Sequence, residues 1–354
     1  MRREFWCGKR VFLTGHTGFK GSWLSLWLSD MGAIVFGYSL DASTTPNLFA
    51  DAQIRKHITQ HTIGDIRDSK SLISAIQIAQ PEIVFHLAAQ SLVRESYVHP
   101  VKTYETNIMG TINLFEAIRK IPNIRVVVNV TSDKCYKNLE QDLPYSENDV
   151  LGGYDPYSSS KACSEILTAA YRNSFLSAGD TFVASARAGN VIGGGDWAAD
   201  RLIPDFFRAT NKRKAIEIRS PNSIRPWQHV LEPLSGYLTL AEHLYVDGKM
   251  FAEAWNFGPT VLENKPVSWI VEYLCKKVPN SKWVKCPIDF QLHEAAILKL
   301  NSSKANEHLK WFPRWNLQTA LNKTIEWYQN WKAGSSVPDL TLRQIYDYEN
   351  SGNL

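Results

Sequence analysis

The feature that most constrains the fold is a strand–loop–helix–strand unit at the start of the chain. "KRVFLTG" (residues 9–15) is a short run of branched and aromatic residues that ends in glycine, a pattern typical of a strand. Apolar residues then recur at helical spacing over residues 23–31, and "AIVFGYS" (33–39) predicts a second strand. A helix between two such strands is the usual crossover of a parallel pair. The chain therefore begins with a parallel βαβ unit.

The same alternation continues through the first half of the chain. Further strands are predicted at 82–90, 125–132 and 181–188, with helices at 69–79, after Pro100 and from Pro156 onward. "RVVVNV" is almost continuously apolar, as expected of a strand covered by helices on both faces. The pattern predicts an α/β fold built on a doubly wound, Rossmann-type parallel sheet. Ligands of such sheets bind at the carboxyl ends of the strands.

The second half of the chain has a different rhythm. Glycines at 193–195 and several prolines interrupt the alternation of strands and helices. Only a short strand at 254–259 and helices at 268–278 and 317–331 are clearly predicted. We predict a Rossmann-type domain over residues 1–189. A smaller mixed α/β domain over 190–354 is expected to interleave partly with it.

Composition narrows the class of protein. A net charge of +4 on 354 residues is too small to indicate a nucleic-acid or membrane-surface partner. No apolar run reaches bilayer length, and the N-terminus shows no signal-peptide pattern. The five cysteines are scattered, without metal-ligand or disulfide-framework spacing. We expect a cytoplasmic protein without a metal site.

The loop between the first strand and the first helix carries glycines in a GxxGxxG frame, "TGHTGFKG". Such glycines allow a tight turn and let the backbone approach a pyrophosphate at the positive end of the following helix. The loop therefore predicts a dinucleotide cofactor, held by Gly15, His16, Thr17, Gly18, Phe19, Lys20 and Gly21. The side chain of His16 could either crowd the cofactor or cap a phosphate.

An acidic residue, Asp41, follows the second predicted strand. An acid at this place can bind the ribose 2′-hydroxyl and would repel a 2′-phosphate, which favours NAD over NADP. Alternatively, Asp41 is a loop carboxylate and Ser39 is the residue at the end of the strand. Both interpretations stay open.

Three motifs together resemble the extended short-chain dehydrogenase/reductase superfamily: the glycine loop, "HLAAQ" (86–90), and Tyr157 and Lys161 four residues apart on one predicted helix. The resemblance implies that Asp65, Ile66, Leu87, Ala88 and Ala89 contact the cofactor. It also implies that Tyr157 removes the proton of an alcohol while hydride moves to the nicotinamide, with Ser132 bonded to the reacting oxygen. A tyrosine pKa of about 10 is too high for this role, so a nearby ammonium and the cationic nicotinamide are expected to lower it.

Within this superfamily, Ser132-Asp133-Lys134 aligns with the Thr-Asp-Glu motif of the nucleotide-sugar 4,6-dehydratases, with lysine in place of glutamate. The resemblance implies that Asp133 protonates the departing C6 hydroxyl. A neutral Lys134 could take the C5 proton that the glutamate takes in those enzymes. A cationic Lys134 could instead stabilise the enolate while another group moves the proton. Both hypotheses remain open.

The resemblance covers residue 5 to residue 331 and implies a substrate, CDP-glucose, whose conversion to CDP-4-keto-6-deoxyglucose serves deoxysugar and lipopolysaccharide O-antigen synthesis. Cytidine rests on the resemblance alone, which also implies a homodimer. Substrate contacts are expected from Gln90, Arg94, Asn190, Arg201, Leu202 and Arg225. The alternatives are a 4-epimerase or decarboxylase of the same superfamily, or an inactive cofactor-sensing protein.

Overall fold

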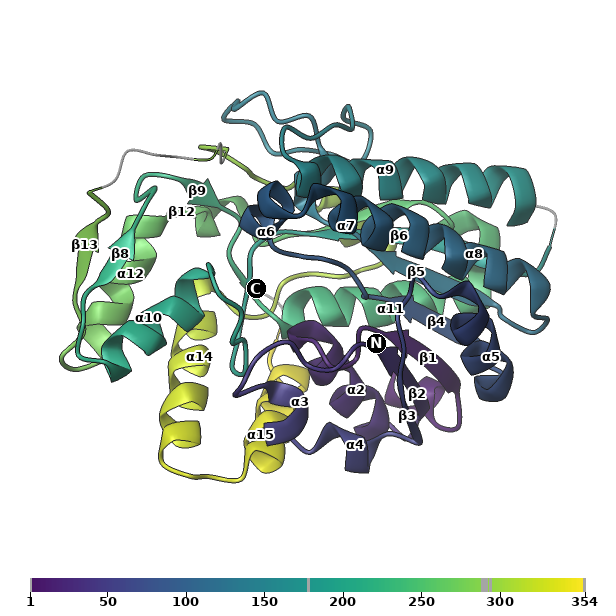
Figure 1. Cartoon of the computed structure of the whole chain (residues 1–354), viewed down its shortest axis with the longest axis horizontal. Helices are drawn as coiled ribbons and strands as arrows, with labels where there is room; N and C mark the ends of the chain where they lie inside the picture. Colours follow the sequence, from purple (N-terminus) through teal and green to yellow (C-terminus); the bar gives the residue numbers. More distant parts are fainter. Residues whose placement is uncertain (1, 177–178, 288–291, 293–294, 353–354) are drawn as a thin grey trace.

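The computed structural model describes residues 2–176, 179–287, 292 and 295–352. Its centre is a sheet of seven parallel strands in the order β11-β6-β5-β4-β1-β2-β3 (Figure 1). The strands are β1 (Arg10–Thr14), β2 (Ile34–Ser39), β3 (Gln60–Ile63), β4 (Ile83–His86), β5 (Val126–Val130), β6 (Phe182–Ala188) and β11 (Ala254–Phe257). The strand order reverses between β1 and β4, which creates a crevice at their carboxyl ends.

Helices cover both faces of this sheet. One face is covered by α2 (Phe19–Asp30) and α11 (Leu231–Asp247), the other by α5 (Ser69–Ala79), α8 (Gly110–Lys120) and α9 (Pro156–Tyr171). Successive strand residues enter different cores: Val11 and Leu13 belong to the cluster with α2, whereas Phe12 belongs to the cluster with α5. The expected doubly wound sheet is confirmed.

The smaller part of the molecule lies beyond the carboxyl ends of the strands, on the left of Figure 1. It contains three two-stranded pairs: β7 (Val191–Ile192) with β10 (Gln228–His229), β8 (Ile216–Ile218) with β13 (Trp283–Lys285), and β9 (Ile224–Arg225) with β12 (Lys265–Pro266). Its helices include α10 (Leu202–Asn211) and α12 (Val267–Lys277). Because α11 and β11 return to the large sheet, the chain crosses between the two parts more than once.

Short helical segments complete the chain. They are α1 (Arg3–Trp6), α3 (Leu48–Asp51), α4 (Ile54–His57), α6 (Val93–Val98), α7 (Pro100–Tyr104), α13 (Ser303–His308), η1 (Glu105–Met109), η2 (Asp133–Cys135), η3 (Arg172–Leu176), η4 (Gly248–Phe251) and η5 (Val261–Glu263). No helix in the described ranges is both long and apolar enough to cross a membrane.

The C-terminal segment, for which the sequence suggested no role, is part of the core. Helix α14 (Leu317–Lys332) is followed by α15 (Val337–Glu349), which packs against both α14 and α2. The Tyr348 hydroxyl donates to the Glu232 carboxylate on α11 over 2.7 Å. Burial raises the pKa of Glu232 to about 7. The last helix therefore joins both halves of the chain.

Candidate active site

A cavity of about 630 Å³ lies where the carboxyl ends of the strands face the smaller part of the molecule. Its size suits a small-molecule ligand. Nearly all residues that the sequence nominated line it: Gly15, Thr17, Gly18, Phe19, Lys20, Gly21, Asp41, Asp65, Ile66, Leu87, Ala88, Ala89, Arg94, Ser132, Asp133, Lys134, Tyr157, Lys161, Asn190, Arg201, Leu202 and Arg225. His16 and Gln90 do not line it.

The His16 side chain points away from the cavity. Its Nε2 lies 2.6 Å from Nδ1 of His61, and its ring fills the space beside Gly37, where a Cβ would lie 2.5 Å from the imidazole. Burial lowers the pKa of His16 to about 3, so the ring is neutral. The imidazole therefore neither crowds the cavity nor caps a phosphate in it.

The Gln90 side chain is used within its own loop. Its amide nitrogen donates to Thr103 Oγ1 over 2.9 Å, and its amide oxygen accepts from the Leu92 backbone N–H over 2.6 Å. Gln90 therefore braces the loop between β4 and α6, beside the cavity.

The glycines of the β1–α2 loop are needed because backbone segments touch there. Gly15 has a positive φ of 78°, and a Cβ on it would lie 2.7 Å from the Ala88 nitrogen. A Cβ on Gly21 would lie 2.1 Å from the Gly15 carbonyl oxygen. The close approach brings the β1–α2 and β4–α6 loops together at the cavity. The N-terminus of α2 there offers unpaired N–H groups to an anion.

The two candidates for the ribose contact differ in their environment. The Ser39 hydroxyl lies 2.8 Å from that of Thr17, which also donates to the Leu40 carbonyl oxygen over 2.8 Å. Asp41 lines the cavity and is exposed. Ser39 also lines the cavity but is bonded to the loop, so the assignment of the ribose contact to Asp41 stays a prediction.

The expected adenine contacts lie at the far end of the cavity. The Asp65 carboxylate pairs with Arg67 over 2.6 Å, and hydrogen bonding from Arg67 lowers the pKa of Asp65. Ile66 packs against Gly110, where a Cβ would lie 2.6 Å from its side chain. Ile66 is buried and also lines the cavity, so its contact with an adenine ring stays a prediction.

Helix α9 presents the Tyr–Lys pair to the cavity. Asp155 caps the helix through the Ser158 N–H over 2.9 Å, and Pro156 occupies its first turn. The Lys161 ammonium donates to the Val130 carbonyl oxygen over 3.3 Å. The spacing of four residues places Tyr157 and Lys161 on the same side of the helix.

Burial opposes the ionisation of both groups. It raises the pKa of Tyr157 to about 12, although a hydrogen bond with Ser132 acts in the other direction. Burial also lowers the pKa of Lys161 to about 8. Desolvation therefore opposes the lowering of the tyrosine pKa that was predicted from a nearby ammonium and the cationic nicotinamide, and the effect of the nicotinamide stays a prediction. A bound cation beside the phenol is needed to reverse the shift.

The Ser132–Lys134 turn follows β5 and is closely bonded within itself. Ser132 Oγ donates to Asp133 Oδ1 over 3.0 Å and accepts from the Lys134 backbone N–H over 3.2 Å. Asp133 is 2 % exposed, and its Oδ2 has no hydrogen-bond partner among the described residues. A Cβ on Gly189 would lie 2.9 Å from that oxygen, so glycine is needed there.

The carboxyl group of Asp133 suits the role of an acid. Burial raises its pKa, and the charge of Lys134 offsets only part of that rise. The neighbouring lysine opposes this rise, but its effect is weaker than that of desolvation. Asp133 can therefore hold a proton at a higher pH than an exposed aspartate can.

Lys20 lies closer to the chemistry than its place in the glycine loop suggested. Its ammonium is 3.5 Å from the Tyr237 hydroxyl. Burial lowers the pKa of Lys20 to about 7, assisted by the charges of Arg201 and Lys161 and opposed by Asp133. Its proximity to Asp133 could not be read from local spacing, since α2 and the turn after β5 meet only in the folded chain.

Three arginines stand at the entrance to the cavity. Arg201 pairs with Asp196 over 3.0 Å and donates to Ser91 over 3.1 Å. Arg94 and Arg219 both contact the Asp200 carboxylate, over 3.6 and 2.9 Å. Arg219 was not predicted to lie there, because its only signal in the sequence is its position directly after the apolar–polar alternation of "IEI".

Arg225 has a different environment from these three. Its guanidinium donates to backbone carbonyl oxygens, including that of Ala296 over 3.2 Å.

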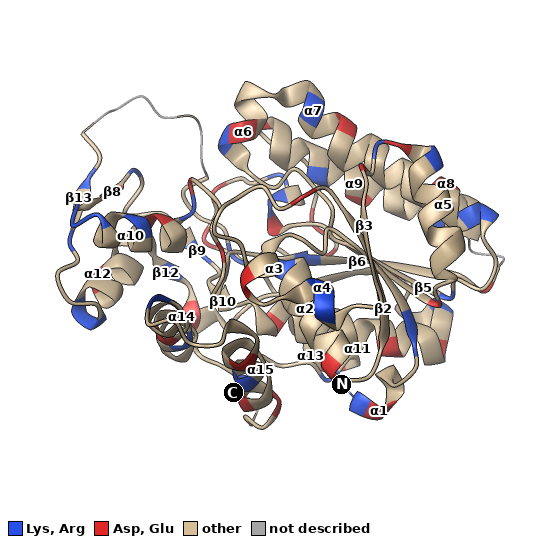
Figure 2. Cartoon of the chain, turned by 60° about the horizontal axis from the view of Figure 1, so that its bottom comes forward, with Lys and Arg blue, Asp and Glu red and all other residues tan. Residues whose placement is uncertain are grey.

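On the outer helices, positive and negative side chains are interspersed (Figure 2). The cavity lining also carries both signs, with nine Lys or Arg and seven Asp or Glu side chains, and its arginines can bind an anionic ligand. Within the described part of the chain, no group of three or more His, Cys, Asp or Glu residues could hold a metal ion.

The parallel sheet, the glycine loop after its first strand and the Tyr–Lys pair beside the cavity define an extended short-chain dehydrogenase/reductase. Residues 12–324 match the profile of the GDP-mannose 4,6-dehydratase family. The chain is also 51% identical over 351 residues to the CDP-glucose 4,6-dehydratase of Salmonella typhimurium, covering 98% of each chain. The chain belongs to this family of nucleotide-sugar 4,6-dehydratases, and the resemblance seen in the sequence is confirmed.

Solved structures of low sequence identity share the fold. The dTDP-glucose 4,6-dehydratase of Bacillus anthracis, in complex with NAD, superposes with a TM-score of 0.76 at 23% identity, over 93% of this chain and 99% of that one. The UDP-glucose 4-epimerase of Thermotoga maritima gives a TM-score of 0.79 at 20% identity, over 91% and 99%. The fold therefore serves both reactions, and the site residues must distinguish them.

Proposed function

We propose that this protein is an NAD-dependent CDP-glucose 4,6-dehydratase that forms CDP-4-keto-6-deoxyglucose and water. The observation that carries the proposal is that one cavity holds two sets of groups. Ser132, Tyr157 and Lys161 suit oxidation of an alcohol, and Asp133 and Lys134 suit loss of water. A 4-epimerase needs only the first set.

The cavity fits NAD. The N-terminus of α2 can receive the pyrophosphate, Asp41 can bind the adenosine ribose, and Ile66 can pack on the adenine. When bound there, NAD would supply the hydride acceptor for C4 of the glucose and the hydride donor for C6. Its cationic ring would also favour the Tyr157 phenolate over the phenol.

The residues of the chain move the protons. Tyr157 takes the proton of the C4 hydroxyl, and Ser132 donates a hydrogen bond to the same oxygen. With C4 oxidised to a ketone, Lys134 takes the proton from C5 while Asp133 protonates the C6 hydroxyl, which leaves as water. Lys134 returns its proton to C5 when the hydride arrives at C6. Solvent then restores the proton of Asp133 and removes that of Tyr157.

The role of Lys134 has a direct test. With substrate, NAD and heavy water, a Lys134→Met variant should form reduced nicotinamide but incorporate no deuterium at C5. Exchange at nearly the normal rate with slowed turnover would assign Lys134 to cationic stabilisation instead. Lys137→Met, on the same stretch, serves as a charge-matched control.

The reaction is tested by incubation with NAD and CDP-glucose, with separate reactions on dTDP-glucose, UDP-glucose and GDP-mannose. We expect the alkaline absorbance of a 4-keto-6-deoxy sugar and a loss of mass equal to one water from CDP-glucose. Product from another nucleotide only would change the substrate and keep the mechanism. An isomer of unchanged mass would overturn the dehydratase in favour of an epimerase.

The proposal includes a cytoplasmic homodimer. The five cysteines are all free, which suits a reducing compartment. Helices α7 and α9 lie side by side and expose apolar side chains, including Val101, Tyr104 and Ile166. Burial of this surface against a second copy would remove it from water. Light scattering should give twice the chain mass, and Val101→Asp should reduce that mass.

A further inference from the structure

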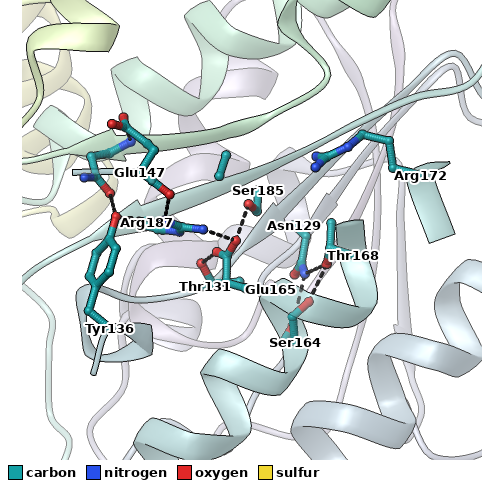
Figure 3. A network of polar contacts seen from close by, with 12 residues as sticks. Asn129, Thr131, Tyr136, Glu147, Ser164, Glu165, Thr168, Arg172, Ser185 and Arg187 are labelled. Carbon is teal, nitrogen blue, oxygen red and sulfur yellow. Dashed lines mark hydrogen bonds and ion pairs between the residues drawn. The ribbon is translucent and has the colours of Figure 1, made fainter. Parts of the chain in front are cut away.

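A buried ion pair is attached to both ends of the turn that carries Asp133 and Lys134 (Figure 3). Arg187 on β6 donates from Nη2 to Glu165 Oε2 on α9 over 2.8 Å. The Thr131 hydroxyl, just before the turn, donates to Glu165. The Tyr136 hydroxyl, just after it, accepts from Arg187 Nη1 over 2.8 Å.

The pair is isolated from solvent and from the ligand. The side chains of Glu165 and Arg187 are 3 % and 4 % exposed, and neither lines the cavity. Burial alone would raise the pKa of Glu165, but Arg187 and the hydroxyls of Ser185 and Thr131 together hold it below its usual value. Glu165 is therefore an ionised carboxylate inside the protein, and its bonds are directional and strong.

The Glu165 carboxylate lies on α9, the helix that also carries the residues proposed for alcohol oxidation. Tyr157, Lys161 and Glu165 succeed one another at intervals of four residues, so they share one side of α9. The charge of Glu165 also supports the ammonium form of Lys161 against burial. The pair thus connects the helix that carries Tyr157 with the turn that carries Asp133.

Further bonds extend the connection beyond the turn. The Tyr136 hydroxyl donates to Asn256 Oδ1 on β11 over 2.7 Å. The Asn256 backbone N–H donates to Glu147 Oε1 over 2.8 Å, and Arg187 Nη1 donates to the Glu147 carbonyl oxygen over 3.1 Å. The position of Tyr136 is therefore fixed by three separate segments of the chain.

We propose that Glu165 and Arg187 are positioning residues for the dehydration step: they hold Asp133 and Lys134 at a fixed place relative to Tyr157 and Lys161. This inference rests on the proposed function, because only a dehydratase must keep both sets aligned on neighbouring carbons of one sugar. A displacement of about 1 Å can reduce a rate by about a hundredfold. The bonds within the turn join Ser132 to Asp133 and Lys134 and do not connect the turn to α9.

Two conservative variants release the Tyr136 end of the turn without removing the buried charge balance. Tyr136→Phe deletes the hydroxyl and keeps the ring against Tyr145, with which it stacks at 5.1 Å. Arg187→Lys keeps a cation for Glu165 but lacks the second guanidinium nitrogen, which donates to Tyr136 in the wild type. Thr168→Val is the matched control, because it removes a bond of 2.7 Å between β5 and α9 that does not involve the turn.

The experiment separates the two chemical steps with CDP-glucose and bound NAD. Rapid-mixing absorbance measures nicotinamide reduction, and deuterium uptake at C5 and product release measure dehydration. For Tyr136→Phe and Arg187→Lys we expect reduction within about threefold of wild type, dehydration slower by about tenfold or more, and accumulation of reduced nicotinamide. The double variant should be no slower than the worse single variant, because both changes break one connection.

Several results would overturn the inference. Equal slowing of both steps would mean a general structural role. If Thr168→Val slows dehydration relative to reduction as much as Arg187→Lys does, any loss of a bond to α9 is enough to impair dehydration. If Tyr136→Phe and Arg187→Lys keep the wild-type ratio of dehydration rate to reduction rate, the ion pair does not position the turn, although the proposed function stands. If wild type reduces NAD but releases no dehydrated sugar, the proposed function itself fails.

Discussion

The two sets of reacting groups in the cavity are built in different ways. Tyr157 and Lys161 stand on a capped sixteen-residue helix, and the helical repeat alone places them on one side. Asp133 and Lys134 stand on a three-residue turn whose position depends on contacts from α9, β6 and β11. One set is fixed by local geometry, the other by the tertiary structure.

The difference separates a shared chemistry from a specialised one. An alcohol-oxidising pair on a helix can be kept in enzymes that do different things afterwards, as the common fold of a dehydratase and an epimerase illustrates. The turn after β5 can then change its residues without disturbing that helix. Variants should therefore divide into those that stop both steps and those that stop only dehydration.

The largest effect is expected from Tyr157→Phe. Without the phenol, no group is placed to take the C4 proton, so reduction and dehydration should both fall by about a thousandfold. Dissociation constants for NAD, measured by fluorescence, should change little. Tyr171→Phe, which removes a hydroxyl from the other end of the same helix, should retain activity. Dehydration that survives loss of reduction would contradict the proposed order of steps.

Asp133→Asn should stop the second step and spare the first. The amide matches the shape of the carboxyl group but cannot protonate the C6 hydroxyl, so dehydration should slow by about a hundredfold. Reduced nicotinamide should accumulate in stopped-flow absorbance traces, with a ketosugar that retains its C6 oxygen by mass. Asp142→Asn, on an exposed part of the following loop, is the control. Loss of reduction to the same degree would mean that Asp133 serves both steps.

A smaller effect is expected from pH, with opposite signs for the two steps. Reduction needs the phenolate of Tyr157, whose pKa of about 12 must be lowered by the cofactor, so its rate should rise with pH. Dehydration needs protonated Asp133 together with neutral Lys134. Because burial raises the pKa of Asp133, the rate should fall as pH rises through that pKa once Lys134 is neutral. Single-turnover rates from pH 6 to 9 should differ in slope, with about tenfold more reduced nicotinamide at the alkaline end. If the rates of reduction and dehydration changed with pH in the same way, the assignment of the two steps to separate sets of groups would be contradicted.

The difference between local and tertiary positioning also explains which features could be predicted from the sequence. The strands of the sheet follow from periodicity, so they were predictable from local patterns. The roles of Tyr157 and Lys161 came from the family resemblance, although the helical repeat alone predicts that they share one side. Strand β3 was missed because its four residues, "QHTI", are mostly polar and lie at the edge of the sheet. The roles of Asp133 and Lys134 came only from family resemblance, and Glu165 and Arg187 gave no signal, since their partners are distant in sequence.

One residue, Lys20, interacts electrostatically with Lys161 of one set and Asp133 of the other, and it should show the smallest but most diagnostic effect. Its pKa of about 7 reflects burial and the positive charges of Arg201 and Lys161, and Asp133 opposes them. An anionic diphosphate in the cavity would favour the ammonium form and raise this pKa. Binding of NAD or CDP-glucose near pH 7 should therefore take up protons, and affinity should weaken as pH rises above 7.

Calorimetric titrations in two buffers of different ionisation enthalpy measure that uptake. Wild type should take up on the order of half a proton at pH 7, and Lys20→Met should take up clearly less. Because the pKa of Lys161 is also lowered, to about 8, some uptake should persist in the variant and move to higher pH. Lys9→Met, whose ammonium pairs with Glu82 outside the cavity, should bind with the wild-type proton uptake. Proton release on binding would contradict the protonation of Lys20 and would point to a group that loses its proton beside the cationic nicotinamide, such as Tyr157.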